Sequence, residues 1–179
     1  LMESEFPEIP SLIYDGPFSQ HLEAQDPAML TGLEALDEVT VQEKVAEFFS
    51  LRPEAFELSG SGEGDIPTYF YTARVDGGEM YVEATRQGGL VLSMMNSRAV
   101  GEQRISVEAG LQRAQEFLTE RNITSMVTSY YQLVDNVLVV NFAYCQDGAV
   151  CYPDLIKVSV ALDTGRIVGY EAMGYLSSH

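Results

Sequence analysis

The sequence is poor in the residues that metal centres, disulfide scaffolds and nucleic-acid surfaces require. Its 179 residues include no tryptophan, two cysteines and two histidines, and ten basic side chains stand against 27 acidic ones, a net charge of −17. Nucleic acids and anionic membrane surfaces bind positive patches, so we expect neither as a partner. No apolar run approaches the roughly 20 residues that span a bilayer, so we expect no membrane insertion by this chain. Residues 1–5 lack the pattern of a signal peptide.

Motifs for catalysis and cofactor binding are also missing. His21 and His179 each lack a second ligand at metal-binding spacing, so we expect no metal site. The sequence has no Gly-x-Ser-x-Gly elbow. Residues 60–64, Gly-Ser-Gly-Glu-Gly, lack the Lys-Ser/Thr ending of a phosphate loop, and we interpret them as a flexible hairpin connection. We therefore expect no catalytic residue and no cofactor.

A repeat is the clearest positive signal. Residues 80–92 and 156–168 both have apolar residues in alternation on either side of a glycine-containing connection, and a constant offset aligns Gly89 with Gly165. Alternation around a short glycine connection predicts a β-hairpin. Each glycine stands where the turn is expected to need a positive φ, which side chains with a Cβ adopt reluctantly.

A helix is predicted before each hairpin. Thr40 and Glu43 have the spacing of a capping box, which predicts the start of the first helix, and Pro53 predicts its end. Ser106 is the predicted N-cap of the second helix, which we expect to stop at Asn122.

These elements predict an α+β fold of two similar units. Each unit is a helix packed on the apolar face of an antiparallel meander, the first at residues 39–100 and the second at 101–179. Extra strands are expected at residues 68–75 in the first unit and at 129–133 and 137–144 in the second. Residues 1–38 do not fit the unit, and we interpret them as an N-terminal strand followed by an acidic linker.

Two local questions stay open on the sequence. If the loop between Cys145 and Cys151 has three residues, the cysteines face each other across a hairpin and can form a disulfide. A two-residue turn instead places them on opposite faces, as two small buried side chains. Tyr130 and Tyr131 are adjacent in a predicted strand, so we expect one in the core and one exposed.

Two blocks of sequence are familiar. Residues 11–21, Ser-Leu-Ile-Tyr-Asp-Gly-Pro-Phe-Ser-Gln-His, and residues 152–172 with the following Gly174-Tyr-Leu resemble the germination protein YpeB family of endospore-forming bacteria. The unit of a helix followed by a meander resembles the PepSY domain, which that family carries in tandem. The resemblance covers the chain from about Ser11 onward, and it implies that this is the C-terminal part of a protein with an N-terminal membrane anchor.

The resemblance implies a non-enzymatic function. Proteins of this family are required for a spore cortex-lytic peptidoglycan hydrolase to accumulate in the dormant spore, and they are thought to restrain it. The expected partner is therefore that hydrolase, and the expected location is the outer side of the inner spore membrane. Two alternatives stay open, a PepSY-type inhibitor of a peptidase and a muropeptide hydrolase that acts through paired carboxylates.

The candidate partner-binding residues lie in the first 38 positions. The turn at residues 14–21 is more elaborate than a plain connection requires, although a rigid anchor for the N-terminal strand explains it as well. Residues 1–65 hold 15 of the 27 acidic side chains, so a basic partner is expected to bind there. The candidates are Tyr14, Asp15, Phe18, His21, Glu34, Asp37 and Glu38.

Overall fold

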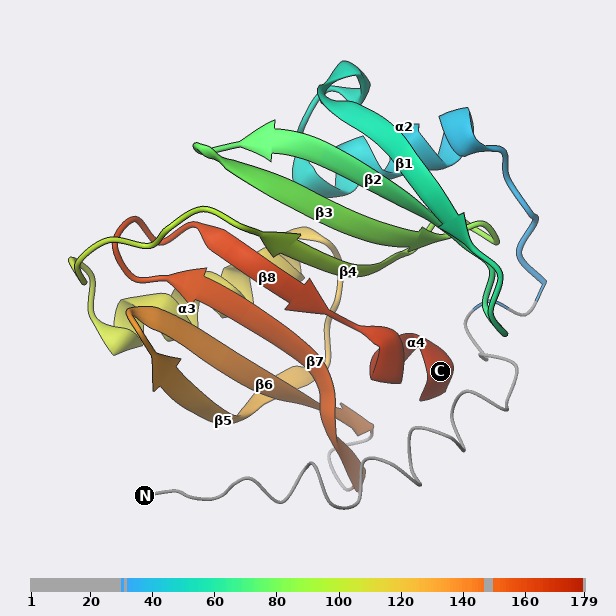
Figure 1. Cartoon of the computed structure of the whole chain (residues 1–179). Coiled ribbons are helices and arrows are strands. Elements are labelled where there is room, and N and C mark those ends of the chain that lie inside the picture. Colours follow the sequence, from blue (N-terminus) through green and yellow to red (C-terminus); the bar gives the residue numbers. More distant parts are fainter. Residues whose placement is uncertain (1–29, 31, 147–149, 179) are drawn as a thin grey trace.

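The computed structural model describes residues 30, 32–146 and 150–178. Within them it contains helices, the short 3-10 turn η2 and the strands of a single sheet (Figure 1). In chain order these elements are α2 (Glu38–Phe49), η2 (Pro53–Ala55), β1 (Phe56–Gly62), β2 (Thr68–Val75), β3 (Gly78–Thr85), β4 (Val91–Asn96), α3 (Val107–Glu120), β5 (Met126–Val134), β6 (Val137–Gln146), β7 (Val150–Ala161), β8 (Ile167–Glu171) and α4 (Met173–Ser178).

The tandem arrangement is confirmed, and it has a feature that the sequence did not indicate. All eight strands join one antiparallel sheet in the order β1-β2-β3-β4-β8-β7-β6-β5. The last strand of each meander therefore pairs with the other: Ser93 on β4 lies opposite Glu171 on β8, and Met95 lies opposite Gly169. The two units share one sheet instead of having one each.

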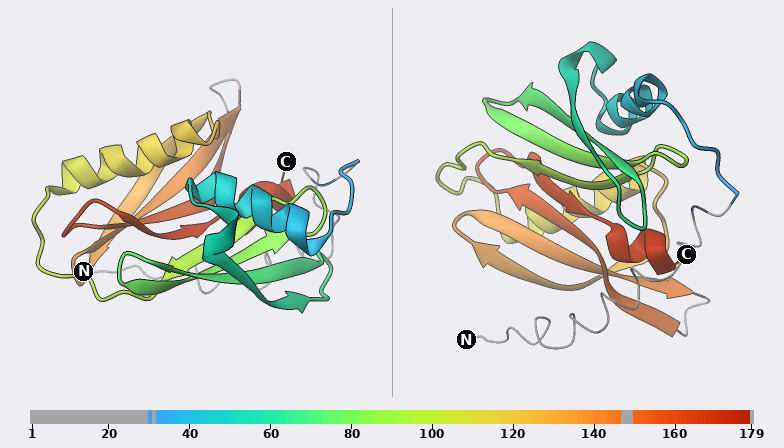
Figure 2. Two further views of the ribbon diagram at one scale, coloured as in Figure 1. Left: turned by 90° about the horizontal axis from the view of Figure 1, so that it is seen from above. Right: turned by 45° about the vertical axis from the view of Figure 1, so that its right-hand side comes forward.

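The two long helices lie on the same side of this sheet (Figure 2). As predicted, each packs on its own meander, α2 on β1, β2 and β3, and α3 on β6 and β7. The units also share a core, because the rings of Phe48 on α2, Phe117 on α3 and Tyr170 on β8 meet between them. Their centroids are 6.0 Å apart for Phe48 and Phe117 and 5.6 Å for Phe117 and Tyr170. The opposite side of the sheet carries no long helix among the described residues.

The start of α2 differs from the prediction. The helix begins at Glu38, and its N-cap is Asp37, whose Oδ1 accepts a hydrogen bond of 2.9 Å from the backbone N–H of Thr40. The predicted capping box at Thr40 and Glu43 is wrong because Asp37, an equally good cap, lies one turn earlier. Ser106 is confirmed as the N-cap of α3, with its hydroxyl accepting from the N–H of Ala109.

Turn geometry follows the sequence at the positions that need a positive φ. Gly89 and Gly165 have φ of 63° and 82°, as the aligned repeats predict. Asn122, just after α3, has φ of 60°. The two glycines lie in the turns between β3 and β4 and between β7 and β8, and all three residues adopt the left-handed region, which glycine and asparagine tolerate best.

Two further predictions are wrong. Residues 60–64 are not simply a flexible connection, because β1 runs to Gly62 and pairs with β2. Tyr130 and Tyr131 do not divide between core and solvent, since both are exposed. They lie on β5, one of the two edge strands of the sheet, whereas α3 packs mainly on β6 and β7, which leaves both faces of β5 exposed at these residues.

Candidate partner-binding groove

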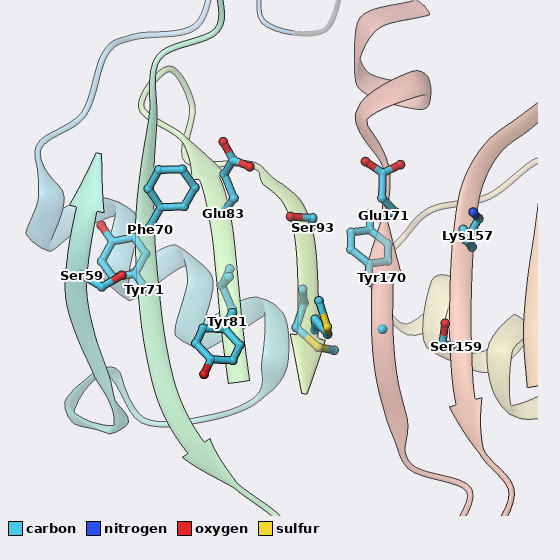
Figure 3. Close-up of a pocket in the computed structure, with 14 residues that line it drawn as sticks. Ser59, Phe70, Tyr71, Tyr81, Glu83, Ser93, Lys157, Ser159, Tyr170 and Glu171 are labelled. Atoms are coloured by element: carbon cyan, nitrogen blue, oxygen red, sulfur yellow. The ribbon is translucent and has the colours of Figure 1, made fainter. Parts of the chain in front are cut away.

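A groove opens on the side of the sheet that faces away from α2 and α3, at the junction of the two units. Met94 on β4 and Tyr170 on β8 are buried in the core. Because side chains alternate along a strand, their neighbours Ser93, Met95 and Glu171 point to the opposite side. These residues and others from β1, β2, β3 and β7 line a hollow of about 660 Å³ (Figure 3).

Strand register sets the chemistry of the groove in two rows. In the first row Glu83 lies opposite Ser93, Ser93 opposite Glu171, and Glu171 opposite Lys157. Figure 3 shows these side chains on four neighbouring strands. In the second row, two residues along each strand, the sequence of cross-strand partners is Tyr81, Met95, Gly169 and Ser159. The first row is therefore mainly charged and the second mainly apolar.

The hollow depends on small residues in its floor. Gly169 lies between Met95 and Ser159, and a Cβ added at Gly169 would stand only 2.9 Å from Ser159 Oγ. Large side chains border this floor, because Tyr81 is 50% exposed and Met95 is 62% exposed. Exposed tyrosine and methionine around a depression are typical of protein-binding surfaces.

The charged groups of the groove interact with one another. Oε2 of Glu83 accepts a hydrogen bond of 2.8 Å from the hydroxyl of Thr68. Partial loss of solvent around Glu171 raises the pKa of its carboxyl, while Lys157 and the backbone N–H of Met173 oppose that rise. Glu83, which lies across Ser93 from Glu171, adds a smaller contribution to the raised pKa of Glu171 by repulsion.

The groove combines a few charged side chains with an apolar floor. Among the fourteen lining residues the charged side chains are Glu83, Glu171 and Lys157, and the hydroxyls belong to serine and tyrosine. Two carboxylates and an apolar floor can hold a cation with a hydrophobic stem. Within the described part of the chain, no three His, Cys, Asp or Glu side chains are placed to hold a metal ion.

The structure places only part of the predicted site. Tyr14, Asp15, Phe18 and His21 lie outside the described residues. The remaining candidates are exposed: two lie at the N-terminus of α2, and Glu34 lies in the segment before it, where its backbone carbonyl accepts from Gly88 N–H at 2.9 Å. They are Glu34, Asp37 and Glu38.

Two of these acidic residues also stabilise the local structure. Asp37 caps α2, and the hydrogen bonds with Thr40 lower the pKa of its carboxyl. The backbone carbonyl of Glu38 accepts a 2.6 Å hydrogen bond from the hydroxyl of Tyr71.

The groove was not predicted from the sequence, because its residues come from strands far apart in the chain. The only local signal was the alternation that placed Tyr81 and Glu83 on one face.

The pair Cys145 and Cys151 is a disulfide, which decides the question that the sequence left open. The two residues lie directly opposite each other on β6 and β7, as the three-residue loop requires. Disulfides persist in oxidising compartments. No helix among the described residues is both long enough and apolar enough to cross a membrane.

Comparisons with known proteins agree on one family. The whole chain, residues 1–179, matches the family model described as YpeB sporulation, PepSY1 and PepSY2 domains. The chain is 42% identical over 99 residues to a sporulation protein YpeB of Halalkalibacterium halodurans, an alignment that covers 55% of this chain and 22% of that protein. It is 28% identical over 152 residues to a sporulation protein YpeB of Oceanobacillus iheyensis, covering 84% of this chain and 34% of the relative.

A solved structure has the same fold. The Bacillus megaterium YpeB C-terminal domain superposes with a TM-score of 0.75 at 25% identity, over 82% of this chain and 67% of that one. The alignments to the two curated relatives cover only between 22% and 34% of their lengths.

Proposed function

Because this chain belongs to the YpeB sporulation family and carries its two PepSY domains, we propose that it is a non-enzymatic module that binds, stabilises and restrains a spore cortex-lytic peptidoglycan hydrolase. The observation that carries the proposal is the groove at the β4–β8 junction. It is exposed, bordered by Tyr81 and Met95, and built from both PepSY units. A surface of this composition favours a protein partner.

The proposed location is extracytoplasmic, on the outer side of the inner spore membrane. The disulfide between Cys145 and Cys151 supports an oxidising compartment. The full-length protein is proposed to be held there by a membrane anchor. The division of the chain at residues 39–100 and 101–179 into two PepSY units, after the segment 1–38, is likewise part of the proposal.

A matched pair of tyrosine variants tests the binding function. Tyr81 in the groove and Tyr131 on the edge strand β5 are similarly exposed, at 50% and 48%. The affinity of the chain for the cortex-lytic hydrolase is measured by calorimetry, with the membrane-anchored protein included. Tyr81→Ala is expected to weaken binding about tenfold, as the loss of an aromatic anchor does, and Tyr131→Ala to leave it unchanged. Absence of any complex, with the anchored protein as well, would overturn the proposal.

Inhibition of a peptidase is a second candidate, favoured by β5. This edge strand, Met-Val-Thr-Ser-Tyr-Tyr-Gln-Leu-Val, contains no charged residue and pairs with β6 on one side. Edge strands of this kind can accept an extended peptide by strand addition. For this function Tyr131→Ala is the test and Tyr81→Ala the control. Inhibition of a spore protease should be relieved by Tyr131→Ala and not by Tyr81→Ala. If no spore protease is inhibited, this second function is discarded.

A further inference from the structure

The groove carries a specific charge pattern beside its apolar floor. Its charged lining side chains are two acids and one base, so it is negative overall. Among the described residues only Thr68 donates to the carboxylate of Glu83, and it does so to Oε2, which leaves Oε1 able to accept from a ligand. Glu83 and Glu171 flank Ser93, one strand on either side. A cation placed over Ser93 would relieve the repulsion between the two carboxylates.

The two rows are separated by a distance that suits a long basic side chain. Tyr81 and Glu83 are two residues apart on β3, which is about 6.5 Å along a strand. The four-carbon stem of lysine spans such a separation, and an arginine stem with its guanidinium does so as well. Apolar stems of this kind pack readily on exposed aromatic and methionine side chains while the charged head stays polar.

We infer that the groove receives a lysine or arginine side chain from an extended segment of its protein partner. The aliphatic stem lies against Tyr81 and Met95, and the cationic head lies between Glu83 and Glu171. Lys157, opposite Glu171 on β7, is a built-in competitor, because its ammonium attracts the same carboxylate. This inference rests on the proposed protein-binding function and names the chemistry that the groove selects.

A peptide probe tests the groove without the hydrolase. The probe is the blocked peptide Ala-Lys-Ala-Lys-Ala, compared with the same peptide carrying norleucine in place of lysine. Backbone amide shifts are followed by NMR at about neutral pH. The lysine peptide is expected to move the signals of Ser93, Ser159 and Gly169, and the norleucine peptide to move them far less. Equal shifts with both peptides, or none with either, would overturn the inference.

Charge variants give the second test, and they act in opposite directions. The double variant Glu83→Gln and Glu171→Gln is expected to lower the affinity of the chain for the lysine peptide and for the hydrolase by at least about tenfold, because charge-assisted hydrogen bonds are lost. Glu57→Gln, an exposed acid on β1 that does not line the groove, is the matched control and should have no effect. Lys157→Gln should strengthen binding, because the competing ammonium is gone.

The outcomes separate this inference from the function on which it rests. If the hydrolase binds the double variant as well as it binds the unchanged chain, the inference is wrong and the binding function stands. If the hydrolase does not bind at all, the binding function is wrong, and the lysine and norleucine peptides still show whether the groove binds a basic side chain. If the double variant fails to fold, as judged by circular dichroism, the sign of the Lys157→Gln effect decides: unchanged or weaker binding would contradict the inference.

Discussion

The ion pair between Arg98 and Asp163 should contribute measurably to stability. Arg98 follows β4 in the connection to α3, and Asp163 lies in the turn between β7 and β8. The carboxylate accepts from Nη1 and Nη2 of the guanidinium, at 2.8 and 2.9 Å, and from the N–H of Gly101 at 2.8 Å. The side chains are only 11% and 12% exposed. The pair therefore fastens the segment between the two units to the second hairpin.

Replacing Asp163 by asparagine removes the charge and turns one acceptor into a donor that faces the guanidinium. Hydrogen bonds to charged groups contribute about 1.5–3 kcal/mol each, and the remaining amide oxygen keeps part of the network. We expect a loss of roughly 2–3 kcal/mol in the free energy of unfolding, since residual solvent access keeps the cost below the 3–5 kcal/mol of a fully buried broken pair. For a chain of this size, that lowers the Tm by roughly 5–10 °C.

The pH dependence gives an independent check of the same pair. The Arg98 guanidinium holds the pKa of the Asp163 carboxyl well below its ordinary value of 3.8. The stabilisation is therefore complete above that ordinary pKa and is lost as the pH falls below it toward the folded-state pKa. Urea unfolding should show the gap between Asp163→Asn and the unchanged chain at about pH 7 and a smaller gap at about pH 2.5.

An exposed ion pair supplies the control for this measurement. Glu79 pairs with Arg74 at 3.5 Å, and the side chain of Arg74 is 82% exposed. Glu79→Gln should change the free energy of unfolding by less than about 0.5 kcal/mol, as exposed pairs do. If Asp163→Asn costs no more free energy of unfolding than Glu79→Gln at neutral pH, or costs the same in acid, then the ion pair between Arg98 and Asp163 does not contribute to stability as expected.

Three further outcomes are expected. Phe117→Ala, which removes the ring shared by both units, should lower the free energy of unfolding by about 3–5 kcal/mol in urea titrations; a cost under about 1 kcal/mol would mean that the units do not share a core. Alkylation under denaturing, non-reducing conditions should find no free thiol at Cys145 or Cys151, and a mass increase from alkylation would contradict the disulfide. Asp37→Asn should keep the Tm, because asparagine is an equally good N-cap, whereas Asp37→Ala should lower it; equal Tm values for the two variants would contradict the capping role.

The hairpins were predictable because their signal is local. Alternating apolar residues and an aligned glycine at positions 89 and 165 specify strand, turn and strand within a short window. The N-cap Ser106 is equally local. The start of α2 was misplaced because Asp37 and Thr40 are both good caps one turn apart, and only the packing of the helix selects between them.

What could not be predicted depends on contacts between distant segments. Strand β1 contains Ser-Gly-Ser-Gly, residues with low strand propensity, and its pairing with β2 overrides that propensity. Nothing near Ser93 or Glu171 in the sequence indicates that β4 and β8 pair. The groove follows from that pairing alone, so its two carboxylates could not be placed together in advance.

The acidic residues at the start of α2 and the groove lie on opposite sides of the sheet. Asp37 and Glu38 begin α2, on the helix-covered side of the sheet, whereas the groove opens on the other side. A basic partner can therefore bind at two negatively charged surfaces, the start of α2 and the groove. Changing Glu34, Asp37 and Glu38 to their amides preserves the helix cap and should flatten the salt dependence of hydrolase association, while groove variants should raise the dissociation rate. If the salt dependence of association stays unchanged, these acids do not contribute to binding and serve only the solubility of the protein.

Photo-crosslinking in dormant spores tests whether the groove binds the cortex-lytic hydrolase. A benzophenone amino acid replaces Met95 at the border of the groove, or Tyr131 on β5, in the full-length protein. We expect the Met95 position to form an adduct with the cortex-lytic hydrolase, identified by mass spectrometry, and the Tyr131 position to form none. An adduct with the hydrolase from Tyr131 alone, or from neither position, would contradict this expectation.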